Sequence, residues 1–165
     1  MSQLLFITLL ILSGILAISL INFLTNRKLK KYLKRDSDNV GVNALKAILF
    51  ICAGLFISEV GAAAKELLNT QSFSTVGNLM IGFIAYFTLF FSISVVVLLL
   101  SIWFAKMTFS VLSKGVNIYE AASRNDAEYL LLFSGISICI CFITRTGLFP
   151  LLISTIQYSE TPIFH

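Results

Sequence analysis

Long apolar runs, separated by short polar segments, dominate the pattern of the chain. The pattern marks four such stretches: Leu4 to Leu24, Asn43 to Leu68, Val76 to Ala105 and Glu128 to Ile156. About 20 apolar residues suffice for one helix to cross the hydrocarbon core of a bilayer. The pattern therefore predicts four transmembrane segments.

These segments read as helices rather than as strands of a barrel. Lipid offers no hydrogen bonds to the backbone, so a span is either a helix or part of a closed barrel. Strands of a membrane barrel alternate polar and apolar residues, whereas the run from Val95 to Leu100 is uniformly apolar. We expect an all-α integral membrane protein with four transmembrane helices.

The composition agrees with a membrane protein and excludes several kinds of catalytic and metal site. Of 165 residues, 58% are hydrophobic and only 12% charged, and the mean hydropathy is +0.93, far from a soluble domain. His165 is the only histidine, which excludes a His-based catalytic pair or a His-rich metal centre. No phosphate-binding loop, nucleophile elbow or paired-carboxylate metal motif is present. We expect no catalytic residues, no metal and no cofactor.

Half of the basic residues follow the first apolar run. They are Arg27, Lys28, Lys30, Lys31, Lys34 and Arg35. Short basic loops stay on the cytoplasmic side, so this segment predicts an inner loop, with both chain ends outside and the first helix retained as an anchor. The same residues are expected to contact anionic lipid headgroups. Since the net charge of +4 is concentrated beside a membrane span, it does not indicate nucleic acid as a partner.

The order of helices and loops repeats. Residues 1–68 form one two-helix unit and residues 69–165 a second, and both enter the membrane in the same orientation, as expected of a parallel duplication. Asn43 and Asn125 open the second helix of each unit, with Gly54 and Gly135 following eleven and ten residues later. We expect a single membrane domain of two tandem units.

Three short motifs carry a resemblance to a known family. They are Lys114-Gly-Val-Asn-Ile-Tyr-Glu120, Arg124-Asn-Asp-Ala127 and Ile156-Gln-Tyr-Ser-Glu-Thr-Pro162, and the stretch from Asp38-Asn39 to Gly54 is similar to an earlier copy. The chain resembles the small bacterial inner-membrane proteins called domain of unknown function 350. The resemblance implies a multi-pass protein of the bacterial inner membrane without an established enzymatic activity, in a family sometimes encoded near envelope-stress or polyamine-related genes.

Two opposite charges fall at matching depths in different helices. Glu59 lies 16 residues after Asn43, and Arg145 lies 17 residues after Glu128, so both reach the outer half of the bilayer at about 1.5 Å per residue. An unpaired charge there costs at least about 2.5 to 3.5 kcal/mol. Three interpretations are open: a clamp between helices, the lining of a path for ions or polar solutes, or snorkelling to the interface.

Lys46 and Glu128 form a second pair of opposite sign, at the inner boundary, where solvation at the headgroup level is the simpler interpretation. A stripe of small residues on one helix predicts close helix packing. Its members are Gly54, Ser58, Gly61 and Ala62.

Three functions remain open. We expect a homo-oligomeric scaffold or an envelope-stress component. One alternative is an oligomeric ion channel or small-solute transporter that uses Glu59 and Arg145. The other is an accessory subunit or effector that binds a membrane or cytoplasmic protein partner.

Overall fold

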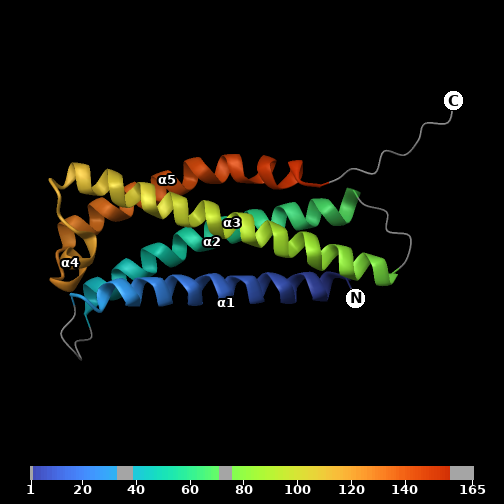
Figure 1. Ribbon diagram of the computed structural model, residues 1–165, viewed down its shortest axis with the longest axis horizontal. Helices are drawn as coiled ribbons and strands as arrows, with labels where there is room; N and C mark the ends of the chain where they lie inside the picture. The colour runs from blue at the N-terminus through green and yellow to red at the C-terminus, as the bar shows by residue number, and fades with distance from the viewer. Residues whose placement is uncertain (1, 33–38, 71–75, 157–165) are drawn as a thin grey trace.

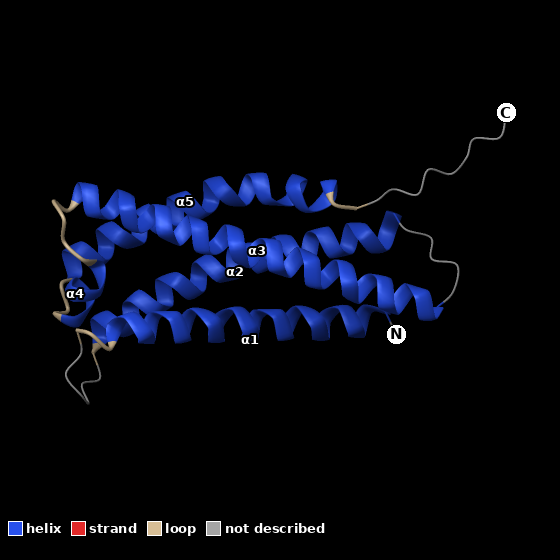
Figure 2. Ribbon diagram, viewed as in Figure 1, coloured by secondary structure: helices blue, strands red, loops and turns tan. Residues whose placement is uncertain are grey.

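The computed structural model describes residues 2–32, 39–70 and 76–156, and within these ranges the chain is helical apart from short loops, without a strand (Figure 2). The helices in chain order are α1 (Ser2–Leu29), α2 (Val40–Thr70), α3 (Val76–Leu112), α4 (Ile118–Ser123) and α5 (Ala127–Ser154). The all-helical fold is confirmed.

Four of these helices are long and apolar enough to cross a membrane. The qualifying segments are Phe6–Leu29, Val40–Asn69, Ile81–Leu112 and Ala127–Ser154. This confirms that the chain has four helices of the length and hydropathy expected for membrane spans. The main difference in bounds lies in α3, which continues past Ala105 to Leu112. Phe109 explains the extension, because its buried ring packs edge-on against Phe133 of α5, with 5.6 Å between the ring centroids.

Helix α2 is the centre of the bundle and contacts α1, α3, α4 and α5 (Figure 1). Large phenylalanine side chains fill the interior between the helices, among them Phe56, Phe83, Phe90 and Phe133. Helix α1 packs mainly on α2 and leaves a broad apolar outer face exposed. A face of this kind suits contact with lipid.

The two ends of the bundle differ. In Figure 1, the beginning of α1 and the end of α5 lie at one end, while α4 and the end of α1 lie at the other. The end that carries α4 also carries the basic residues Arg27 and Lys28 in the last turn of α1. Because short basic segments are expected on the cytoplasmic side, this end is called the inner end from here on. Lys34, Arg35 and the tail from Gln157 to His165 lie outside the described residues.

Helix α4 is short, and hydrogen bonds at its N-terminal cap stabilise it. The side chain of Asn117 accepts a hydrogen bond of 3.0 Å from the Tyr119 amide and so caps the first turn. Before it, the chain turns back at Gly115, whose φ of +89° lies in the left-handed region that follows many helices. The Asn117 amide also donates to the Tyr32 hydroxyl at 3.1 Å. Helix α4 therefore ties the end of α1 to the loop after α3.

Candidate functional site

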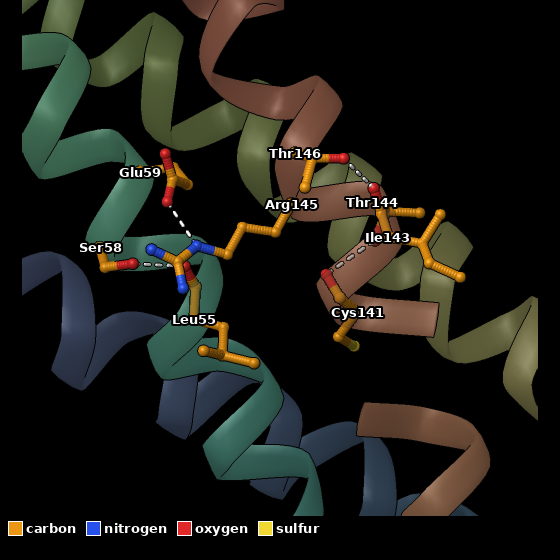
Figure 3. A network of polar contacts seen from close by, with 8 residues as sticks. All are labelled: Leu55, Ser58, Glu59, Cys141, Ile143, Thr144, Arg145 and Thr146. Carbon is orange, nitrogen blue, oxygen red and sulfur yellow. Dashed lines mark hydrogen bonds and ion pairs between the residues drawn. The ribbon is translucent and has the colours of Figure 1, made fainter. Parts of the chain in front are cut away.

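Glu59 and Arg145 meet between α2 and α5. Arg145 extends from α5 toward α2 (Figure 3), and its Nε donates to the Glu59 Oε1 at 2.5 Å. The Glu59 side chain is 12% exposed and that of Arg145 35%. The pair is thus closed on the carboxylate side and partly open on the guanidinium side.

The depth of the pair explains why the two charges need each other. Glu59 and Arg145 lie 19 and 18 residues after the first residues of α2 and α5, a rise of about 27 to 29 Å along each helix. Both residues lie inside helices that are long and apolar enough to cross a membrane, and a single charge within a bilayer is costly unless a partner neutralises it. A charge-assisted hydrogen bond supplies that neutralisation and fixes the rotation of both helices.

A neutral polar contact lies beside the ion pair and connects α5 to α3. The Ser101 hydroxyl donates to the Thr144 hydroxyl at 3.0 Å, and Thr144 precedes Arg145 in the chain. Thr144 in turn donates to the Ile140 carbonyl of its own helix at 2.8 Å. Consecutive residues of α5 therefore bind two different helices, and this site links three of the four spans.

Lys46 and Glu128 do not meet. The described residues show no ion pair between these two side chains. Lys46 is half-buried and Glu128 is exposed in the first turn of α5, where a carboxylate is favourable beside the helix N-terminus.

The stripe of small residues divides between two surfaces. Gly61 is buried against α1, where an added Cβ would come within 3.1 Å of Leu10 Cδ1. Gly54, Ser58 and Ala62 are exposed, and an added Cβ on Gly54 would meet nothing within 4 Å. Only Gly61 thus serves close packing within the chain.

The sequence patterns did not predict a polar junction at the inner end. The buried Asn39 caps α2 by accepting from the Gly41 amide at 3.0 Å, and its own amide donates to the Ser123 carbonyl at 2.6 Å. The Gly41 amide also donates to the Asn125 Oδ1 at 2.7 Å. Asn125 holds a φ of 59°, a conformation that asparagine tolerates well. The paired asparagines Asn39 and Asn125 join the start of α2 to the start of α5.

The described basic residues of the first loop, Arg27, Lys28, Lys30 and Lys31, are all exposed. Close to them lies Tyr119 of α4. Burial raises the pKa of Tyr119, and the charge of Lys28 lowers it in part. Tyr119 is therefore a neutral phenol at physiological pH.

Comparisons with protein-family models, with curated proteins and with solved structures find no match to this chain. The resemblance to domain of unknown function 350 therefore stays a prediction. Within residues 2–32, 39–70 and 76–156, no group of three His, Cys, Asp or Glu side chains gathers in a way that could hold a metal ion.

Proposed function

We propose that the protein is a non-catalytic scaffold of a bacterial inner membrane that associates with copies of itself through the exposed face of α2. The observation that carries this proposal is the exposure of Gly54, Ser58 and Ala62 outside the chain's own bundle. Small residues at this spacing let two helices approach closely, and packing between helices drives association in lipid. A role in envelope stress is part of the proposal and rests on the family resemblance alone.

The outer face of α1 supports this choice by contrast. It exposes large branched side chains, including Ile7, Ile11 and Ile15, each more than half exposed. Such side chains suit lipid contact, whereas a row of small residues leaves a shallow furrow that another helix fills better. We therefore assign the subunit contact to α2.

Replacing Gly54 with leucine is expected to weaken self-association at least about tenfold, because close helix approach depends on the missing side chain. The fold of one chain should survive, since an added Cβ at this position meets nothing within 4 Å. Gly14→Leu is the matched control, because Gly14 of α1 also faces open space. Mass measurements over a dilution series in nanodiscs separate the two variants. Equal association by both would contradict the assignment of the contact to α2.

The proposed orientation places the inner end in the cytoplasm. In a background with alanine at Cys52, Cys139 and Cys141, a probe cysteine at Lys31 or Lys114 should resist an impermeant thiol reagent in intact cells. A probe at Asn69, at the opposite end of α2, should react. The orientation is proposed because short basic loops stay on the cytoplasmic side. Labelling at position 31 or 114 before lysis would show that the orientation is the opposite one.

The tandem duplication has support in the register of the charge pair. Glu59 and Arg145 are 86 residues apart, and so are Asn39 and Asn125, which sit at the starts of the same two helices. Gly61 and Gly147 share this spacing. A shift of 86 residues therefore aligns α2 with α5 more closely than the pairing of Asn43 with Asn125 does, as expected of a parallel repeat.

A second candidate, an oligomeric ion channel, is favoured by one observation. Arg145 keeps 35% of its side chain exposed at a depth where exposure to lipid is costly. In an oligomer, that open side of the pair would face a neighbouring chain or a water-filled lumen. A lumen predicts that Glu59→Gln changes ion flux into liposomes or its pH dependence. Unchanged flux in an intact Glu59→Gln oligomer leaves the scaffold as the function.

A further inference from the structure

A cavity of about 530 Å³ at the inner end lies outside the sites described above. Its walls come from α1, α2, α3 and α4. One part of the lining is apolar and belongs to the membrane-spanning segments: Ile21, Leu24, Leu49, Leu99 and Ile102. The other part is basic and polar: Thr25, Arg27, Lys28, Lys31, Lys106 and Tyr119. The cavity is therefore amphipathic.

The charges in the cavity all have one sign. Four of the lining side chains are cations, and the described lining contains no carboxylate. Lys106 is half-buried, and in the part of the chain that the structure describes it makes no ion pair. A partly buried ammonium group without an anion is unfavourable. The cavity thus presents a positive site that calls for an anionic ligand.

Tyr119 holds Lys106 in place and adds a donor. The Lys106 ammonium donates to the Tyr119 hydroxyl and lies 4.8 Å from the centre of its ring, as in a cation–π contact. Among the described residues, the Tyr119 hydroxyl accepts from Lys106, and no hydrogen bond that it donates is found. A neutral phenol that accepts from the lysine can still donate to an oxygen of a ligand.

The position of the cavity indicates where such a ligand comes from. Trp103 lies one turn before Lys106 in α3 and is exposed, and tryptophan is typical of the interface between lipid and water. The basic side chains therefore lie at headgroup level, with the apolar lining on the membrane side. A ligand with a phosphate group and an acyl chain would fill both parts of the cavity, with its phosphate against the cations and its acyl chain against the apolar residues.

We propose that this cavity is a binding site for an anionic phospholipid, in which Arg27, Lys28, Lys31 and Lys106 hold the phosphate and Tyr119 donates to it. Basic pockets between transmembrane helices on the cytoplasmic side bind lipid headgroups in this way. The site goes beyond the proposed scaffold function and does not depend on it. It also differs from general attraction of the basic loop to a charged surface, because it requires Lys106 of α3 and Tyr119 of α4.

The test measures lipid binding to the full-length protein in a neutral detergent by native mass spectrometry. The probes are dioleoylphosphatidylglycerol, dioleoylphosphatidylcholine and water-soluble glycerol phosphate. Phosphatidylglycerol should bind at least about tenfold more tightly than phosphatidylcholine, since both lipids carry the same phosphate but the choline group of the second adds a positive charge that the cationic lining repels. Equal binding of the two lipids would overturn the proposal.

Variants separate the cavity from the surface. Lys106→Met should weaken phosphatidylglycerol binding about tenfold, and Tyr119→Phe should weaken it severalfold while it preserves the ring. Lys30→Met is the matched control, because Lys30 belongs to the same basic segment but does not line the cavity. Lys30→Met should change binding by less than about twofold, as expected of a screened surface charge. Equal losses for Lys30→Met and Lys106→Met would overturn the cavity site.

Two further outcomes are decisive. If glycerol phosphate binds as tightly as phosphatidylglycerol, the ligand is a soluble phosphate ester and the acyl chain plays no part. If Lys106→Met does not fold, Tyr119→Phe decides alone, and unchanged lipid affinity in that variant contradicts the proposal.

Discussion

Glu59→Gln and Arg145→Gln are each expected to destabilise the protein by about 3 to 5 kcal/mol, the cost of leaving one charge of a buried pair without its partner. The ion pair of 2.5 Å between α2 and α5 is the contact that each substitution breaks. The partial exposure of Arg145 places Glu59→Gln toward the lower end of that range. The double variant should lose less than either single variant, because no unpaired charge remains in the membrane.

Unfolding of the purified wild type, singles and double in the same detergent yields the coupling energy between the two sites. Thr146→Ala is a suitable control, since the exposed Thr146 hydroxyl, within the described part of the chain, donates only to the Ile143 carbonyl of its own helix. Additive losses in the double variant would show that the two charges act independently. That result would contradict a clamp between α2 and α5.

Gly41→Ala is expected to destabilise the protein by about 3 kcal/mol, the upper end of the usual cost of forcing an atom into a filled site. An added Cβ would lie 2.4 Å from the Ala122 carbonyl oxygen and 2.9 Å from the Asn125 Oδ1. Since the first of these atoms belongs to the backbone, the start of α2 would have to move away from α4. The movement would also break the hydrogen bond from the Gly41 amide to Asn125.

Gly135→Ala is the matched control for this prediction. An added Cβ at Gly135 meets nothing within 4 Å, and alanine is the better helix former by about 1 kcal/mol. Thermal unfolding should therefore show a lower midpoint for Gly41→Ala and an unchanged or higher midpoint for Gly135→Ala. Equal midpoints for the two variants would mean that the polar junction at the inner end contributes little to stability.

The sequence could predict the spans and the meeting of the charges for the same physical reason. Lipid demands long apolar helices, so the runs of apolar residues delimit them closely. Once two helices enter from the same end, distance along each helix converts directly into depth, and the depths of Glu59 and Arg145 match. The sequence did not specify which helices are neighbours or how each helix is rotated about its own axis.

For the stripe on α2, helical periodicity does not predict which residues pack within the chain. Helical spacing places Gly54, Ser58 and Ala62 on one face, yet it does not say whether that face meets the chain's own helices or another chain. Gly61, the fourth member of the stripe, is instead buried against Leu10. Only the packing of α1 on α2 separates the inward glycine from the outward one.

The inner end was missed because its contacts connect residues far apart in the chain. The close approach at Gly41 depends on Asn125, which is 84 residues away, and no local pattern encodes it. Helix α4 did leave a local signal. Asn117 followed by Glu120 three residues later is typical of a capped helix start, but six residues are too few to form an apolar run.

Self-association is tested most directly by the mass of the full-length protein in lipid nanodiscs at several ratios of protein to lipid. One chain has a mass of 18.3 kDa. If the chain associates with itself through α2, the dominant particle should contain two or more copies at every ratio, and it should shift toward one copy for Gly54→Leu but not for Gly14→Leu. A wild-type protein that stays at one copy per nanodisc, even at high protein content, would contradict self-association.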